Sequence, residues 1–323
     1  MNIAIIGTGI AAATLVYRLR QSCPGSSLQV FEKSRGIGGR MSTRRSDHGT
    51  FDHGTPFFTA RSKSFQQLLK LFQSSGQVEA WQPKVITLSK HAKPYNRDWF
   101  ETHYVATPGM NSLCKTLMAD QSIQFNQTIN RVSGEPGHWI IHSAEGGEFG
   151  AFDWVISTAP PEQTQAIFSK NTTSEFPTVP YQPSFALMVS CAEDYVPPFD
   201  AARVKDSCID WLFFAHRKPG RSQRPSLVVH ATGDYSAKHF DDDQDDVKSE
   251  QILELTQLID IEPGAIQLHR WKYAKVIAPY GEEFWQSDLK GLAACGDWCL
   301  GNEVEHAYTS ADALAKALTQ ALE

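Results

Sequence analysis

Two glycines near the start of the chain have the spacing of a phosphate-binding turn. Gly7 and Gly9 follow the apolar stretch Ile-Ala-Ile-Ile and precede an amphipathic one. In a strand–turn–helix unit the first glycine permits a tight turn, and the second lets the backbone approach a pyrophosphate at the helix N-terminus. Ala12 occupies the third position, where a small residue suffices for close helix–strand packing. The pattern predicts a dinucleotide site.

An acidic residue and a second glycine-rich loop follow. Glu32 lies about 20 residues after the turn, where a carboxylate can accept hydrogen bonds from a ribose diol. Lys33 comes next, and Gly38, Gly39 and Arg40 can supply backbone amides and a guanidinium to a dianion. An exchanging NAD needs no second clamp of this kind, so the two motifs favour a resident FAD.

The elements that would position these residues can be read from hydrophobic periodicity. Residues 3–7 and 28–33 are predicted as buried parallel strands around a helix over 11–22. Segments 184–194, 207–216 and 225–235 predict an antiparallel sheet, and 246–260 an amphipathic helix after a solvated acidic loop at 241–246. A strand at 291–298 and a helix at 303–322 return to the first fold.

This order predicts an α/β protein in which a Rossmann-type domain is assembled from both ends of the chain. The FAD-binding domain is expected to be discontinuous, over 1–60, 100–165 and 285–323. The inserted substrate domain, mainly an antiparallel sheet with helices, is expected over 61–99 and 166–284.

Composition excludes several other classes. The 323 residues are 41% hydrophobic and 20% charged, as in globular proteins, and the net charge of -6 argues against a nucleic-acid partner. No segment has the length of a membrane span or the pattern of a secretory signal. Six scattered cysteines form neither a disulfide framework nor a metal site, so a reducing cytoplasmic location is expected.

The paired glycine motifs resemble those of the FAD-dependent amine oxidase superfamily, whose two-domain architecture is similar to that of p-hydroxybenzoate hydroxylase. In that comparison Gly296, Asp297 and the following helix, with Glu305 near its start, look like the C-terminal flavin motif. Val132 looks like the residue whose backbone contacts adenine. No covalent attachment motif is recognisable, so the resemblance implies a non-covalent FAD.

Within the superfamily the chain resembles the renalase-like oxidases nearly end to end, most clearly in Phe-Asp-His-Gly at 51–54 and His-Arg-Trp-Lys-Tyr-Ala at 269–274. This resemblance implies hydride transfer from isomeric 2- and 6-dihydro-NAD(P) to FAD, with O₂ reduced to H₂O₂. The catalytic candidates are His269 and His53. The candidate substrate pocket comprises Thr55, Pro56, Phe57, Trp211, Trp271 and Tyr273.

Strand alternation adds a prediction about this segment. If His269 faces the pocket, Trp271 and Tyr273 face it too, and Arg270 and Lys272 point outward. That arrangement counts against Lys272 as the lysine that some amine oxidases place near flavin N5. A basic loop with Arg217, Lys218 and Arg221 could bind substrate phosphates or simply be solvated.

Three alternatives remain open at this point. The chain could be a true amine oxidase or a desaturase, a flavoprotein that senses redox state without turnover, or an NAD-dependent dehydrogenase without flavin. The expected partners are a dinucleotide substrate and O₂, with no nucleic acid, membrane or metal. Either a monomer or a dimer fits the sequence.

Overall fold

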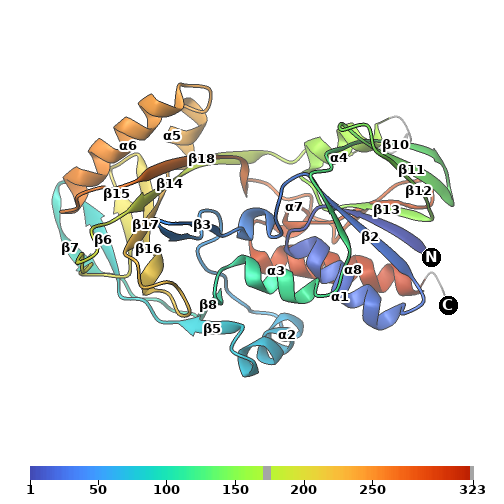
Figure 1. The fold of residues 1–323 in the computed structure, drawn as a ribbon, viewed down its shortest axis with the longest axis horizontal. Coiled ribbons are helices and arrows are strands. Elements are labelled where there is room, and N and C mark those ends of the chain that lie inside the picture. Colours follow the sequence, from blue (N-terminus) through green and yellow to red (C-terminus); the bar gives the residue numbers. More distant parts are fainter. Residues whose placement is uncertain (170–175, 321–323) are drawn as a thin grey trace. The chain divides into compact units, whose positions relative to one another are not determined.

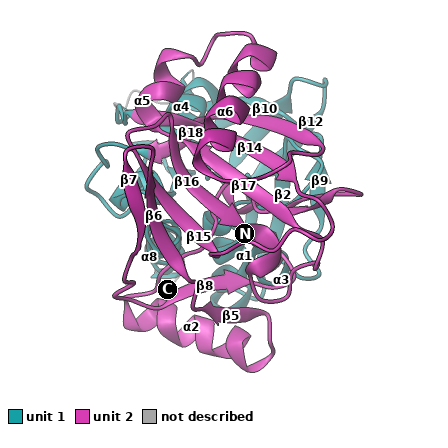
Figure 2. Cartoon of the chain, turned by 90° about the vertical axis from the view of Figure 1, so that its left-hand side faces the viewer, with its two compact units in different colours: residues 1–39, 113–180, 276–323 teal, residues 40–112, 181–275 magenta. Residues whose placement is uncertain are grey.

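The computed structural model describes residues 1–169 and 176–320. The chain separates into two compact units, which Figure 2 colours separately. Unit 1 comprises Met1–Gly39, Leu113–Pro180 and Val276–Glu323, and unit 2 comprises Arg40–Ser112 and Tyr181–Lys275. Each unit is built from segments that are distant in the sequence. The predicted assembly of one domain from both chain ends is therefore observed.

Unit 1 contains a six-stranded sheet of order β19-β20-β13-β1-β2-β9. All neighbouring pairs are parallel except β19 with β20. Residues 3–6 of β1 are buried, as expected for a central strand that is covered on both faces. The strands are β1 (Asn2–Ile6), β2 (Ser27–Glu32), β9 (Ile123–Phe125), β13 (Trp154–Ser157), β19 (Trp285–Gln286) and β20 (Leu292–Ala294).

The first and last long helices of unit 1, α1 (Ile10–Ser22) and α8 (Val304–Gln320), pack side by side (Figure 1). Arg18 on α1 joins them, because its Nε pairs with Asp312 at 2.6 Å and its Nη2 donates to the Tyr308 hydroxyl at 2.6 Å. The predicted apolar stripe of the terminal helix, Ala307, Ala311, Leu314 and Leu318, is buried. Residues 321 and 322 of that predicted helix lie outside the described residues.

A separate three-stranded antiparallel sheet interrupts the parallel order of unit 1. It consists of β10 (Ile129–Glu135), β11 (His138–Ser143) and β12 (Glu148–Phe152). In the chain this sheet lies between the parallel strands β9 and β13. The other helices with residues in unit 1 are α3 (Asn111–Leu117), which begins in unit 2, α4 (Pro161–Phe168), which packs on β10, and α7 (Asp297–Leu300).

Unit 2 is organised around a seven-stranded sheet of order β18-β14-β17-β16-β15-β6-β7. The paired strands from β14 to β7 run antiparallel, except that β6 and β15 are parallel. The strands are β6 (Val85–Ser89), β7 (Ala92–Asn96), β14 (Tyr181–Ser190), β15 (Ala201–Lys205), β16 (Ile209–Phe214), β17 (Ser226–Ala231) and β18 (Ile266–Val276).

The two faces of this sheet have different characters. One face packs against α6 (Gln244–Leu258) in an apolar core that includes Leu187, Leu212 and Leu255. The opposite face carries Trp211, because the adjacent residue Leu212 on β16 belongs to that core. His230, the register partner of Trp211 on β17, lies on the same face as Trp211.

The acidic run at 241–246 differs from the predicted solvated loop. Asp243 is the N-cap of α6, and its carboxylate accepts a hydrogen bond from the Asp245 backbone amide at 2.8 Å. Asp245 and Asp246 occupy the first turn of the helix. Carboxylates at a helix N-terminus satisfy free amides and complement the helix dipole, so half of this run is a helix start.

Smaller elements extend unit 2 beyond its main sheet. Two short antiparallel pairs are formed by β3 with β4 and by β5 with β8. The remaining elements are η1 (Gly39–Met41), β3 (Arg44–Ser46), β4 (Gly49–Phe51), α2 (Lys63–Ser74), β5 (Val78–Trp81), β8 (His103–Ala106), η2 (Ala215–Arg217) and α5 (Gly233–Lys238).

The two compact units divide the chain at other residues than the predicted domains. Residues 40–60 and 100–112 belong to unit 2, whereas 166–180 and 276–284 belong to unit 1. Pairing explains two of these shifts: β4 packs on β17, and β8 pairs with β5. Such long-range pairing leaves no compositional boundary in the sequence. Residues 170–175 and 321–323 of the predicted domains lie outside the described residues.

Candidate functional site

The turn after β1 has the geometry that its glycines predict. Gly7 has φ +108°, and its amide donates to the Phe31 carbonyl at 2.8 Å. A Cβ on Gly7 would lie 2.4 Å from Oγ1 of Thr158, so a larger residue would clash. Gly9 is the N-cap of α1, with nothing within 4 Å of a hypothetical Cβ. Ala12 is fully buried, as close helix–strand packing requires.

The N-terminus of α1 is suited to an anion. Its first turn contains no acidic residue, and no side chain caps it. Open space above Gly9 leaves the amides of this turn accessible to a ligand. A helix N-terminus of this kind binds phosphate through backbone N–H groups and the helix dipole.

Glu32 at the end of β2 is held in place by its neighbours. The side chain is 7% exposed. Oε2 accepts from the Thr8 hydroxyl at 2.6 Å, and Oε1 accepts from the amide and hydroxyl of Ser34 at 2.8 and 2.6 Å. A carboxylate has about four acceptor positions, so these three bonds leave one position of Glu32 for a ribose hydroxyl.

The second glycine motif meets the first one in unit 1. The Gly38 amide donates to the Thr8 carbonyl at 3.0 Å. A Cβ on Gly39, where φ is +54°, would lie 3.3 Å from the Gly9 Cα. Lys33, between the two motifs, is exposed. The sequence placed these motifs about 30 residues apart, and the fold brings their backbones together beside the α1 N-terminus.

The other predicted cofactor residues are distributed over both units. In unit 1, Val132 is buried in β10, Gly296 is the N-cap of α7, and Asp297 begins that helix with 4% exposure. Glu305 is buried in the first turn of α8. Arg40 belongs to unit 2, where its carbonyl accepts from the Thr55 amide at 2.8 Å.

These features of unit 1 fit the ADP half of FAD. The open glycine turn suits a pyrophosphate, and the oriented Glu32 carboxylate suits a ribose. The buried Asp297 lies at the start of α7, where the C-terminal flavin motif was predicted. When bound, FAD supplies the acceptor for a hydride and the means of passing two electrons to O₂.

In unit 2, both predicted catalytic histidines lie against Trp271. The ring centroids of His53 and His269 are 4.9 Å apart, and that of Trp271 lies 4.3 Å from His269 and 5.3 Å from His53. The indole Nε1 of Trp271 donates to the His53 carbonyl at 3.0 Å. Arg270 and Lys272 are exposed, as strand alternation predicts.

The imidazoles of this cluster favour their neutral forms. Burial lowers the pKa of His53 to about 3, and repulsion from a protonated His269 and from Arg44 contributes. Burial likewise lowers the pKa of His269 to about 4, with Arg44 contributing. His230 on β17 has a pKa lowered to about 4 by burial and by Lys218. At neutral pH all three rings are uncharged.

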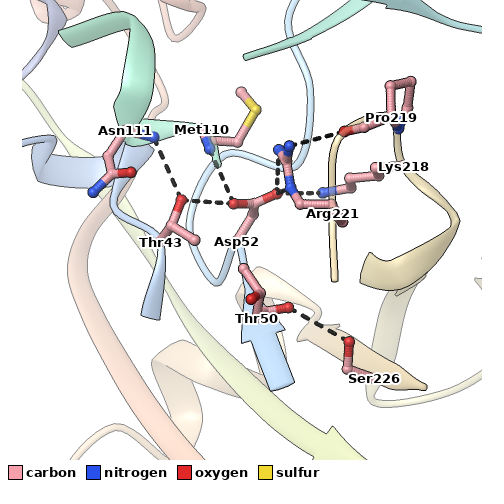
Figure 3. A network of polar contacts seen from close by, with 9 residues as sticks. All are labelled: Thr43, Thr50, Asp52, Met110, Asn111, Lys218, Pro219, Arg221 and Ser226. Carbon is pink, nitrogen blue, oxygen red and sulfur yellow. Dashed lines mark hydrogen bonds and ion pairs between the residues drawn. The ribbon is translucent and has the colours of Figure 1, made fainter. Parts of the chain in front are cut away.

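A buried ion-pair network holds the segment that contains His53 (Figure 3). Oδ2 of Asp52 lies 2.8 Å from Nη2 of Arg221 and 3.2 Å from Nζ of Lys218. Oδ1 accepts from the Thr43 hydroxyl at 2.7 Å and from the Met110 amide at 3.1 Å. All three charged side chains are fully buried. The network ties the loop after β4 to the loop after η2.

The charges of this network keep it ionised. Burial opposes ionisation of Asp52, but the attraction of Lys218 and Arg221 outweighs burial and lowers its pKa to about 2. Burial lowers the pKa of Lys218 to about 8 despite the ion pair with Asp52. Lys218 and Arg221 are therefore not solvated, as one reading of the basic loop expected, and their charges are paired with Asp52. Arg217, the third candidate, pairs with Asp200 at 2.7 Å.

The predicted pocket aromatics form a second cluster in unit 2. Phe57 lies 5.0 Å from Trp99 and 6.0 Å from Phe213 between ring centroids. Trp99 in turn lies 6.2 Å from Trp211, which stacks on Phe213 at 5.5 Å with an interplanar angle of 12°. Phe57 and Trp211 are thus joined through Phe213 and Trp99, and Trp99 was not among the aromatic residues suggested by the sequence.

The other predicted pocket residues are Tyr273, Thr55 and Pro56, and no described ring contact joins them to either cluster. Tyr273 packs edge-on against Tyr181 at 5.4 Å. Thr55 and Pro56 are partly exposed between the His53 loop and Phe57. Three residues important to the site were missed: Asp52, His230 and Trp99. The available signal for Asp52 was its place directly before His53 in the Asp-His-Gly segment.

Three further observations concern the part of the chain that the structure describes. Among residues 1–169 and 176–320, no group of three or more His, Cys, Asp or Glu side chains could hold a metal ion. In the same residues, no helix combines the length and apolarity needed to cross a bilayer. All six cysteines are free thiols.

Solved structures share this architecture across nearly the whole chain. A candidate protoporphyrinogen oxidase from Exiguobacterium sp. 255-15 is 11% identical, with a TM-score of 0.76 and 99% of each chain covered. An oxidoreductase from Methanosarcina mazei is 12% identical, with a TM-score of 0.72 and 98% and 100% covered. Putrescine oxidase bound to putrescine is 11% identical, with a TM-score of 0.70 and 98% and 99% covered. At these identities the likeness concerns the fold.

Family models cover most of the sequence. Residues 5–74 match the NAD(P)-binding Rossmann-like domain, which includes the two glycine motifs and Glu32. Residues 80–319 match the flavin containing amine oxidoreductase family, which includes His269, Trp271 and Asp297. The chain is therefore an FAD-dependent oxidoreductase that belongs to the flavin containing amine oxidoreductase family.

Proposed function

We propose that this protein is an oxidase for isomeric dihydronicotinamide dinucleotides, the 2- and 6-dihydro forms of NAD(P). In the overall reaction the dihydro isomer, O₂ and a proton give NAD(P)⁺ and H₂O₂. The observation that carries this proposal is the cluster of His53, His269 and Trp271. Its three flat rings lie against one another, and the lowered pKa values of both histidines keep their imidazoles neutral. The partners in this proposal are the dinucleotide substrate and O₂.

The neutral imidazoles suit a hydride donor. A dihydropyridine becomes aromatic when it loses hydride, so its oxidation needs orientation and stacking and no proton abstraction. Trp271 offers a flat apolar surface, and neutral His269 can donate or accept one hydrogen bond that orients a carboxamide. A neutral His53 adds no positive charge that would oppose formation of the cationic nicotinamide product.

The strand geometry of β18 supports the same preference over amine oxidation. An amine oxidase of this family would be expected to use a lysine near the flavin, and Lys272 is exposed on the face away from His269. The buried lysine of unit 2, Lys218, pairs with Asp52. A small amine or an apolar substrate remains the competing activity, and the experiment below has an arm for it.

The test is anaerobic mixing of the FAD-loaded protein with purified 2- and 6-dihydro-NAD(P), followed by absorbance of the oxidised flavin. We expect bleaching within seconds with at least one isomer, and none on that timescale with 4-dihydro-NAD(P)H or putrescine. Faster bleaching by putrescine or another amine than by either isomer would replace this proposal with an amine oxidase. A flavin that no substrate bleaches would indicate a redox sensor and contradict the proposal.

A further inference from the structure

The second aromatic cluster of unit 2 ends at an indole flanked by two guanidinium groups. The carbon at the centre of the Arg203 guanidinium lies 5.6 Å from the Trp211 ring centroid, and that of Arg97 lies 6.0 Å from it. Trp211 is partly exposed, and Arg97 is exposed. We propose that Trp211, Arg97 and Arg203 bind the adenosine phosphate end of a 2′-phosphorylated dihydronicotinamide dinucleotide. This inference rests on the proposed function.

The two positive charges beside the Trp211 indole would favour binding of an anion. Arg203 forms an ion pair with Asp210, but no carboxylate in the described part of the chain pairs with Arg97. The two guanidiniums repel each other, and desolvation together with this repulsion lowers the pKa of Arg203. A phosphate dianion placed between two arginines would remove that repulsion and accept charge-assisted hydrogen bonds. An adenine ring would stack on the exposed part of the Trp211 indole.

Sheet register places this indole on the same face as the imidazole cluster. Trp211 is the register partner of Arg203 on β15 and of His230 on β17. Directly paired residues of neighbouring antiparallel strands lie on one face of a sheet. On β18, Leu268 packs on the opposite face with the α6 core, so His269 and Trp271 lie on the Trp211 face.

The separation of the two clusters matches the two ends of a dinucleotide. In the strand order β18-β14-β17-β16-β15, four spacings separate the strand of His269 from that of Arg203. Four spacings correspond to roughly 19 Å. A dinucleotide joins its two heterocycles through two riboses and a pyrophosphate, so it can extend across several strands. His230 on β17 lies on a strand between those of His269 and Trp211, and its ring centroid is 5.6 Å from that of Phe213 in the second cluster.

The basic residues that the sequence suggested for phosphate are already committed elsewhere. Lys218 and Arg221 pair with buried Asp52, and Arg217 pairs with Asp200. Among these cations and those beside Trp211, Arg97 alone has no carboxylate partner in the described residues. Arg97 is therefore the residue whose removal should most weaken recognition of phosphate.

The test separates this subsite from the chemistry by comparing a dinucleotide with a mononucleotide. Binding of adenosine 2′,5′-bisphosphate to the FAD-loaded protein is measured by calorimetry for wild type, Arg97→Ala, Trp211→Leu and the control Arg224→Ala. Arg224 is also exposed, but it pairs with Glu193. Flavin reduction is then followed with the 6-dihydro isomers of NADP and of nicotinamide mononucleotide.

We expect Arg97→Ala and Trp211→Leu to weaken binding of the bisphosphate about tenfold, as loss of one charged or stacking contact predicts. Both variants should raise the concentration of dihydro-NADP needed for half-maximal reduction, and Arg97→Ala should leave reduction by the mononucleotide unchanged. The control should match wild type. Unaltered bisphosphate binding in both variants, or an equal loss with the mononucleotide, would overturn the subsite. If neither isomer reduces the flavin but Arg97→Ala still loses bisphosphate binding, the proposed activity fails and the subsite stands.

Discussion

The indole Nε1 of Trp271 donates a hydrogen bond to the carbonyl oxygen of His53 across 3.0 Å, joining residues 218 positions apart in the chain. This bond fixes Trp271 against the loop after β4 and leaves its ring beside the His53 and His269 imidazoles. Asp52, one residue earlier, anchors the same loop through Lys218 and Arg221. The short loop after β4 is therefore fixed by two sets of contacts, the hydrogen bond from Trp271 and the ion pairs of Asp52.

Replacing the anchoring carboxylate should destabilise the fold. Asp52→Asn leaves Lys218 and Arg221 buried without their counter-charge, and breaking a buried pair in this way costs about 3–5 kcal/mol. The free energy of unfolding in urea should fall by that order. Glu193→Gln, which removes the partner of exposed Arg224, should change it by less than about 1 kcal/mol. Equal effects of the two substitutions would show that the buried network contributes no more to the free energy of unfolding than an exposed ion pair.

Stability should decrease on mild acidification because of His53. Its pKa of about 3 in the folded protein lies below the ordinary value of 6.5, so between these values the unfolded chain binds more protons. Stability therefore rises with pH across this window and is lost as pH falls below 6.5. From pH 6.5 to 5 the loss from His53 is of the order of 1–2 kcal/mol. In urea titrations at pH 7 and pH 5, His53→Gln should lose less stability than wild type; an identical loss would rule out this role.

The pH dependence of flavin reduction should reflect the neutral imidazoles. Because His53 and His269 have pKa values of about 3 and 4, neither changes charge between pH 5.5 and 7.5. The rate constant for flavin reduction by an isomeric dihydro-NAD(P) should vary less than about twofold over this range. Stopped-flow absorbance measures it directly. A rate that rises tenfold around pH 6.5 would indicate a histidine acting as a base.

Cofactor retention and hydride transfer should separate by unit. Glu32→Ala removes the carboxylate placed for the ribose and should lower the FAD content of purified protein, whereas Glu135→Ala, an exposed control, should not. His269→Ala should keep full FAD content and slow flavin reduction at least tenfold. Arg270→Ala, on the adjacent exposed position, should match wild type. A colourless His269→Ala protein would reverse this division of roles.

Local rules explain what the sequence could predict. The turn at Gly7 and Gly9, the carboxylate of Glu32 at the end of β2 and the alternation of His269 with Arg270 all depend on residues within one βαβ unit or one strand. Such patterns are set by backbone geometry, so they can be recognised without knowledge of the rest of the fold. The stripe of α8 from Ala307 to Leu318 belongs to the same class.

The features that could not be predicted depend on contacts distant in sequence. Asp52 meets Lys218 and Arg221 across more than 160 residues, and no periodicity encodes that pairing. From the sequence alone, the loop with Lys218 and Arg221 looks solvent-exposed, because it is basic and contains glycine and proline. Only the fold shows that the buried Asp52 carboxylate pairs with both residues. Tyr273 shares a face with Trp271, but the position of Tyr181 decides which ring it packs against.

The identity of the hydride donor is tested most directly by product stoichiometry under air. The FAD-loaded protein is incubated with purified 6- or 2-dihydro-NAD(P), and NAD(P)⁺ is quantified by chromatography while H₂O₂ and O₂ are followed in the same sample. We predict one NAD(P)⁺ and one H₂O₂ for each O₂ consumed, over many turnovers per FAD. Turnover with putrescine or another amine, and none with either isomer, would contradict the account.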